Sequence, residues 1–185
     1  MRIISGNFKS IKLFSPKNSY IRPTLDRAKE MIFSTLNSIL TARNLDFNNL
    51  IVLDCFCGTG ALGFECLSRG SGKVFFVDKS PHAINLVKKN SSLLGVSDKS
   101  VIIKTDFAKI ENLGLNIKLF FIDPPYNSFD YNGILKQLIL KNIVAEESFG
   151  VVETSSKDDF NIIDDFSILK KKKNSDSFFY FIERN

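Results

Sequence analysis

Residues 51–63 read IVLDCFCGTGALG, which is three apolar residues and an acid followed by a glycine-rich turn. A short apolar run of this kind is typical of a strand buried on both faces in a parallel sheet. Gly58 and Gly60 permit a tight turn and let the backbone approach a ligand closely. The mostly apolar residues 61–68 then predict a helix. A strand, a glycine turn and a helix in this order indicate a ligand-binding α/β fold.

Strands and helices alternate through the rest of the chain. We expect strands over 74–77, 101–104, 119–122 and 149–153, helices over 81–94 and 131–140, and a closing antiparallel pair over 162–169 and 178–183. This alternation predicts a doubly wound, mostly parallel, seven-stranded sheet. Residues 170–173 are four lysines, which we interpret as a charged turn before the last strand.

An extension precedes this main body. Residues 2–4 and 10–13 are expected to pair as a short hairpin, and residues 25–40 to form a helix, because their apolar side chains recur with a helical period. We therefore expect a basic hairpin and helix over residues 1–43 and a main body over residues 44–185, packed as a single compact unit.

The positive charge of the chain is concentrated at its beginning. Residues 1–30 carry seven basic and two acidic side chains, whereas the remaining basic and acidic groups balance. Such a segment attracts polyanions, and a solvated basic N-terminus is the alternative interpretation. The residues that we expect to contact nucleic acid are Arg2, Lys9, Lys12 and Arg22.

Several classes of protein are disfavoured. No apolar run approaches the ~18 residues that span a membrane, and the N-terminus lacks the apolar core of a signal peptide. Cys55, Cys57 and Cys66 are too few and too close for a disulfide framework, which predicts a reducing, cytoplasmic location. Cys55 and Cys57 also lack the further ligands of a zinc site, so we expect no metal. Nothing in the sequence requires more than a monomer.

Acidic residues follow the predicted strands. Asp54, Asp78, Asp106 and Asp123 lie at or just after four strand ends, where α/β sheets bind their ligands. An acid after the first strand suits a cation such as the sulfonium and amino groups of S-adenosylmethionine (AdoMet), and would repel a pyrophosphate. Asp78 has the spacing of an acid that binds ribose hydroxyls. Asp106 and Phe107 are candidates for the adenine, although Asp106 is equally suited to cap a helix.

The segment Asp123-Pro124-Pro125-Tyr126 ends the hydrophobic run before it. A carboxylate and a backbone carbonyl can accept both N–H bonds of an exocyclic amine, which frees the lone pair of the nitrogen for methylation. Asp123 and Pro124 supply these two acceptors, and the two prolines make the turn rigid. The ring of Tyr126 is suited to stack on a flat base.

The DPPY segment resembles the motif of amino-methylating class I AdoMet-dependent methyltransferases. Residues 2–13, 22–36 and 53–70 further resemble the RsmD family, which methylates the 2-amino group of one guanine in 16S ribosomal RNA. The chain departs from the usual family pattern at residues 171–181, KKKNSDSFFYF, where the family often has a Tyr-Gly pair.

The resemblance implies an rRNA (guanine-N2)-methyltransferase whose AdoMet-dependent domain is the main body. It implies a partner in 16S ribosomal RNA, within a small subunit or an assembly intermediate. Asp123, Pro124, Pro125 and Tyr126 would form the amino-group site. The cofactor residues would be Asp54, Phe56, Gly58, Thr59, Gly60, Asp78, Lys79, Asp106 and Phe107, with Arg22 and Thr24 closing over the cofactor or the base.

Three alternatives stay open. An adenine-N6 methyltransferase acting on nucleic acid shares the DPPY segment. A glutamine-N5 protein methyltransferase usually has asparagine where this chain has Asp123. A non-catalytic RNA-binding module would need no AdoMet, and the intact glycine turn argues against it.

Overall fold

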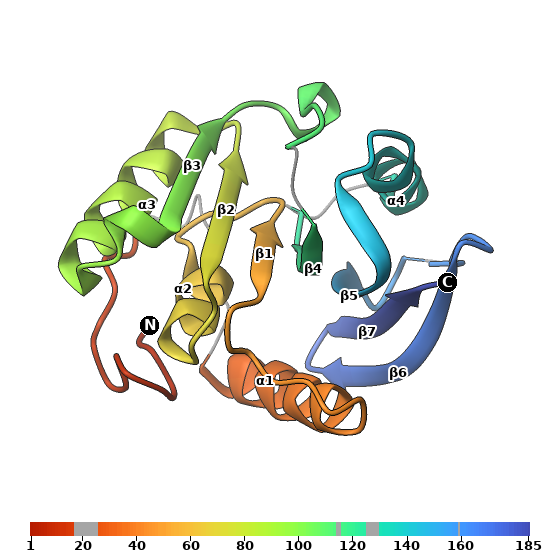
Figure 1. The fold of residues 1–185 in the computed structure, drawn as a ribbon, viewed down its shortest axis with the longest axis horizontal. Coiled ribbons are helices and arrows are strands. Elements are labelled where there is room, and N and C mark those ends of the chain that lie inside the picture. Colours follow the sequence, from red (N-terminus) through yellow and green to blue (C-terminus); the bar gives the residue numbers. More distant parts are fainter. Residues whose placement is uncertain (17–25, 114–115, 125–129, 159) are drawn as a thin grey trace.

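The computed structural model describes residues 1–16, 26–113, 116–124, 130–158 and 160–185. Its strands form a seven-stranded sheet in the order β3-β2-β1-β4-β5-β7-β6 (Figure 1). The strands are β1 (Ile51–Asp54), β2 (Lys73–Asp78), β3 (Ser100–Lys104), β4 (Ile117–Ile122), β5 (Val144–Ser155), β6 (Phe166–Asn174) and β7 (Ser177–Arg184). The helices are α1 (Asp26–Thr41), α2 (Ala61–Ser68), α3 (Pro81–Leu94) and α4 (Tyr131–Leu140), with 3-10 turns η1 (Ser97–Lys99) and η2 (Phe107–Lys109).

The predicted α/β fold with a seven-stranded, mostly parallel sheet is confirmed. Strand β1 lies at the centre and pairs in parallel with both β2 and β4. The chain winds outward through β2 and β3 on one side and through β4 and β5 on the other, so the strand order reverses between β1 and β4. Among the strands that the structure describes, β7 runs in the opposite direction to the other six, so its pairs with β5 and β6 are antiparallel. A ligand crevice is expected beyond the carboxyl ends of β1 and β4.

Helices cover both faces of the sheet. One buried cluster joins the apolar sides of α1, α2 and α3 to residues such as Val52 and Phe121. The alternate residues, such as Leu53 and Phe120, point to the other face and pack with α4 and η2. Figure 1 accordingly shows α4 beside β5, apart from the other three helices. Burial on both faces explains why the central strands are apolar runs.

Local capping signals set the ends of α3. Ser80 precedes the helix, and its side chain accepts a bond from the N–H of Ala83 at 3.4 Å. Pro81 occupies the first helical position, where a missing N–H costs nothing. These signals lie next to each other in the sequence, and the predicted helix over 81–94 agrees with the structure at both ends.

The N-terminal segment is less regular than expected. The predicted hairpin is present as one isolated antiparallel bridge between Arg2 and Lys12, with turns between them. Ile3 and Leu13 are buried in the cluster that also contains α1. The ring of Phe33, on α1, contacts those of Phe47 and Phe121 at centroid distances of 5.7 and 6.1 Å. Residues 1–16 and α1 therefore share a core with the central strands.

The interpretation of the four lysines as a turn was wrong. Residues 170–173 belong to β6 and pair one by one with residues 181–178 of β7. The turn comes later, at Ser175 and Asp176. Lysine is a weak strand former, but pairing with β7 overrides that preference, and lysine is tolerated on an edge strand that faces water.

Candidate functional site

The glycine turn after β1 lies between β2 and β4. The N–H of Cys55 donates to the carbonyl of Phe121 on β4, and the N–H of Cys57 donates to the carbonyl of Val77 on β2, both at 3.0 Å. The turn then closes with a 2.7 Å bond from the N–H of Gly60 to the carbonyl of Cys57. The turn is thus held at the reversal point of the sheet.

Gly60 has a conformation that other residues rarely adopt. Its φ is +79°, and a Cβ atom there would lie 2.5 Å from the ring of Phe64. The ring of Phe64 is itself packed against that of Phe76, at a centroid distance of 4.7 Å. Glycine is needed here because both the backbone angle and the space exclude a side chain.

Asp78 fixes the shape of the turn. One oxygen of its carboxylate accepts the N–H of Gly58 at 3.0 Å, and the other accepts the N–H of Ser80 at 2.8 Å. A carboxylate oxygen has a second lone-pair site, so the group retains acceptor capacity for a ligand hydroxyl. Lys79, the next residue, is exposed.

Asp54 is almost completely buried beneath the turn, at 2% exposure. Burial raises the pKa of this carboxyl to about 7; the N–H of Gly63, which donates at 3.2 Å, opposes the rise, and the charge of Asp78 adds to it. A cation placed beside Asp54 would favour its ionised form. The arrangement therefore suits a positively charged ligand group.

Phe56 and Phe107 face each other on the next part of this edge. Their ring centroids are 5.5 Å apart, and Phe107 is buried. Asp106 caps η2, because its carboxylate accepts the N–H of Ala108 at 3.1 Å. The helix-cap role that the sequence allowed for Asp106 is therefore confirmed. The N–H of Thr105 donates to the carbonyl of Asp78, which joins this loop to the end of β2.

Asp123 and Pro124 follow β4 at the same edge as the glycine turn. Asp54 pairs with Phe121 across the sheet, so Asp123 stands two residues beyond that pair. Asp123 is half-buried and Pro124 is buried. The other predicted members of the site, namely Pro125, Tyr126, Arg22 and Thr24, lie outside the described residues.

The predicted RNA-binding residues lie on the N-terminal segment. Lys9 and Lys12 are exposed. Arg2 forms an ion pair with Asp26 at 3.2 Å, with its side chain 56% exposed. Lys29 is fully buried behind them and donates to the carbonyl of Arg2; burial lowers the pKa of this lysine. The segment is thus anchored by α1 while its other cations face solvent.

Two buried polar residues that the sequence analysis missed hold the N-terminal segment in place. Glu65, on α2, accepts the N–H groups of Ile4 at 2.8 Å and Ser5 at 3.0 Å, and it also binds Arg69. Asn90, on α3, accepts the N–H of Phe14 at 2.7 Å and donates to its carbonyl at 3.1 Å. Each is a polar residue on the buried side of its helix. That break in the apolar pattern was the signal from which a buried polar contact could have been predicted.

Asn90 also reaches the glycine turn. Its amide donates to the carbonyl of Thr59 at 3.0 Å, and the hydroxyl of Thr59 contacts the sulfur of Met1 at 3.6 Å. The N-terminal segment and the candidate ligand turn are therefore joined through the side chain of Asn90 and through the contact between Thr59 and Met1.

We expect Asn90→Ala to lower the free energy of unfolding by about 1–3 kcal/mol, because it removes both partners of the Phe14 backbone and leaves the buried carbonyl of Thr59 without this bond. The matched control is Asn85→Ala, an exposed asparagine of the same helix, which should change stability by less than about 0.5 kcal/mol. Urea unfolding of both variants measures the difference, and equal effects would contradict the bridging role.

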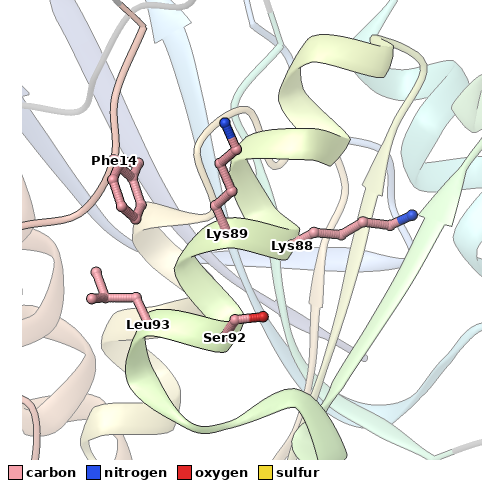
Figure 2. A pocket seen from close by; sticks show the side chains of 5 residues that line it. All are labelled: Phe14, Lys88, Lys89, Ser92 and Leu93. Carbon is pink, nitrogen blue, oxygen red and sulfur yellow. The ribbon is translucent and has the colours of Figure 1, made fainter.

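A separate hollow of about 450 Å³ lies over the outer side of α3. Phe14, Lys88, Lys89, Ser92 and Leu93 line it. Figure 2 shows Phe14 and Leu93 on one side of the helix, with Lys89 beside Phe14 and Lys88 directed away. The described residues that line this hollow include no carboxylate, whereas Asp54 and Asp78 lie at the glycine turn after β1. We therefore place the candidate site at the carboxyl edge of the sheet.

The described residues contain no cluster of three or more potential metal ligands, and none of their helices is long and apolar enough to cross a membrane. Burial raises the pKa of all three thiols. A thiol that stays protonated is a poor nucleophile and a poor metal ligand.

Comparison with known proteins gives consistent matches along the whole chain. The family model described as Conserved hypothetical protein 95 matches residues 1–183. The chain is 29% identical to "Ribosomal RNA small subunit methyltransferase D" of Haemophilus influenzae, over 93% of this chain and 88% of the relative. It is 31% identical to "Putative rRNA methyltransferase YlbH" of Bacillus subtilis, over 83% and 82%. The solved structure "Putative methyltransferase yhhF from Escherichia coli" superposes with a TM-score of 0.85 at 22% identity, covering 100% of this chain and 98% of that one.

Proposed function

Because the chain belongs to the RsmD family, whose model matches residues 1–183, we propose that it methylates the exocyclic 2-amino group of a specific guanine in 16S ribosomal RNA, with AdoMet as donor. The observation that carries the proposal is the placement of two features at one edge of the sheet. The acid-lined glycine turn follows β1, and Asp123 with Pro124 follows the adjacent β4. One feature suits a cationic cofactor and the other suits an amino group.

The residues around the turn fit AdoMet. Asp54 offers a buried carboxyl to its positive charge, and Asp78 retains acceptor capacity for the ribose hydroxyls. The ring of Phe56, which packs on that of the buried Phe107, offers a surface on the side where Asp106 begins η2. The backbone around Gly58 and Gly60 permits close approach. When bound, AdoMet supplies a methyl group that is attached to a positively charged sulfur.

Asp123 and Pro124 are proposed to orient the amino group. The carboxylate of Asp123 and the carbonyl of Pro124 accept its two N–H bonds, so the nitrogen lone pair is directed away from them. Tyr126, which lies outside the described residues, is proposed to stack on the base. Flipping a base into such a site costs a few kcal/mol, and less where the base is already unpaired.

The RNA assignment rests on the names of the relatives and on charge. Two relatives are named as rRNA methyltransferases. The surplus of basic groups in residues 1–30 would attract phosphates, and Lys9 and Lys12 are exposed on the N-terminal segment. We propose that residues 1–43 face the RNA while the remainder carries out the transfer.

The direct test is methyl transfer from labelled AdoMet to small ribosomal subunits from cells that lack this protein. Nucleoside analysis of the product identifies the methylated atom. We expect the label in N2-methylguanosine at one site of 16S RNA. Label in N6-methyladenosine would replace the target with adenine, and absence of AdoMet binding would overturn the cofactor assignment.

The raised pKa of Asp54 predicts that AdoMet affinity depends on pH. A cationic ligand requires the ionised carboxyl, and in the free protein that group titrates near pH 7. We expect affinity to rise by up to about tenfold between about pH 6 and pH 7.5, because protons compete with the ligand at lower pH. Calorimetric titration measures the affinity, and Asp54→Asn should bind weakly with little pH dependence.

The stability of the ligand-free protein should change in the opposite direction. The carboxyl of Asp54 has a higher pKa when folded than the ordinary value of 3.8. Between about pH 4 and pH 7 the folded state therefore holds more protons than the unfolded state, and the free energy of unfolding falls as pH rises. Asp54→Asn should remove this component, and an unchanged pH profile would show that Asp54 titrates normally.

A further inference from the structure

The carboxyl-terminal half of β6 carries four consecutive exposed lysines, Lys170–Lys173, on the outermost strand of the sheet. Neither the fold nor the proposed reaction accounts for them. Among the described residues, no ion pair involves any of these lysines. Acids of neighbouring strands are engaged elsewhere, because Glu183 binds Arg43 at 2.5 Å and the buried Glu153 accepts from Ser177 at 2.8 Å. The run therefore presents a concentrated positive charge to solvent.

The register of the sheet places this charge at the edge that carries the candidate site. Ile122 pairs with Val152 on β5, Val152 with Tyr180 on β7, and Tyr180 with Lys171 on β6. Strand β6 also runs in the same direction as β4, since both β5 and β6 are antiparallel to β7. Lys171 therefore lies at the same height along the strands as Ile122, the residue before Asp123. The two residues are three strand spacings apart, or roughly 14 Å.

Two of the lysines are backed by aromatic rings. The amino nitrogen of Lys171 lies 4.1 Å from the ring centroid of Phe178 and 4.8 Å from that of Tyr180. The amino nitrogen of Lys173 lies 5.7 Å from the Phe178 centroid. Because strand residues alternate between faces, Lys171 and Lys173 share one face, roughly 7 Å apart. The rings limit the freedom of both side chains, which reduces the entropy lost when they bind an anion.

Protection of the sheet edge against aggregation is the simpler explanation for edge lysines. It does not explain their distribution along the strand. The first half of β6, Phe166–Leu169, has no charged residue and exposes 44% of Ile168, although it is equally at the edge. The charge is confined to the half of the strand that lies at the reactive edge.

We propose that Lys171 and Lys173 form a phosphate-binding edge that holds the backbone of the substrate RNA beside the target base. This inference rests on the proposed function, since it assigns a second contact surface to the same substrate. The N-terminal segment and β6 would then contact the RNA on two sides of the reaction centre.

The test is the salt dependence of binding to small ribosomal subunits from cells that lack the protein. The variant is Lys171→Gln with Lys173→Gln. The matched control is Lys73→Gln with Lys99→Gln, which removes equal charge from exposed positions at the opposite, amino edge of the sheet. Each phosphate contact contributes roughly 0.7–0.9 to the slope of log affinity against log salt concentration. We expect the β6 variant to lose about 1.5 from that slope and the control to keep it.

Further outcomes of this test decide the inference. Lys171→Arg with Lys173→Arg should retain the slope, because charge and ring contact persist. An unchanged slope in the glutamine variant overturns the phosphate-binding edge, and self-association of that variant with an unchanged slope would assign the lysines to edge protection. Methyl transfer by the wild-type protein is measured on the same subunits. If it is absent, the proposed function fails; if it is present while the slope is unchanged, only the inference fails.

Discussion

Asp123→Ala is expected to lower the rate of methyl transfer by about 10²–10³-fold. The reason is that the variant loses one of the two proposed acceptors that orient the amino group, and loss of a single preorganised polar contact at a reaction centre has an effect of this size. Asp123 follows β4 directly and is half-buried at the edge shared with the glycine turn. Initial rates with saturating AdoMet and excess small subunits measure the effect.

Two comparisons separate this role from a general loss of structure. Asp123→Asn keeps one acceptor oxygen and should lose less activity than the alanine variant. Asp98→Ala removes an exposed acid from η1, before β3, and should leave the rate unchanged. AdoMet affinity should stay within about threefold of wild type, because Asp123 is assigned to the amino group. Near-normal transfer by Asp123→Ala would remove the residue from the reaction centre.

Gly6→Ala should lower the free energy of unfolding by about 2–4 kcal/mol, the sum of a strained backbone and a steric overlap. Gly6 has a φ of +83°, and a Cβ atom there would lie 1.8 Å from the backbone oxygen of Ser68. That oxygen also accepts the N–H of Asn7 at 2.7 Å, and the Ser68 side chain accepts the N–H of Phe8 at 3.0 Å. The variant must move the N-terminal segment away from α2 and lose these bonds.

Gly95→Ala is the matched control for this prediction. Gly95 also has a positive φ, +66°, but a Cβ atom there would meet nothing within 4 Å. Its cost is therefore the backbone strain alone, about 1–2 kcal/mol. Urea unfolding of both variants gives the difference. If Gly6→Ala were no more destabilising than Gly95→Ala, the close approach to Ser68 would not matter for stability. RNA binding should weaken in the Gly6 variant only, because only that segment carries the proposed RNA contacts Lys9 and Lys12.

Elements with local signals were predictable to the residue. Ser80 and Pro81 mark the start of α3, and the helices over 61–68 and 131–140 agree with the structure. The predicted ends of the strands were less accurate. A strand continues as long as a neighbouring strand pairs with it, and that pairing is not visible in the local sequence. Strand β5 begins at Val144 rather than near residue 149, and the pairing of β6 with β7 carries the lysine run.

The candidate site was also predictable only in part. The acids after β1, β2 and β4 could be expected at one edge, because parallel strands bring their carboxyl ends together. The bonds that shape the turn could not be predicted, since the partners of Gly58 and Thr59 are Asp78 and Asn90, 20 and 31 residues away. Nothing local to either residue indicates its partner.

By itself, the sequence determined the α/β class, the order of the elements, the family and the residue types that stand in the candidate site. These follow from short-range periodicity, capping and motif spacing. Only the tertiary structure decided that Asp54 is buried with a raised pKa, that Asn90 joins the N-terminal segment to the glycine turn, and that the lysine run forms part of a strand level with the edge that carries the candidate site. The physical reason is that burial, electrostatic environment and strand register depend on contacts between residues far apart in the chain.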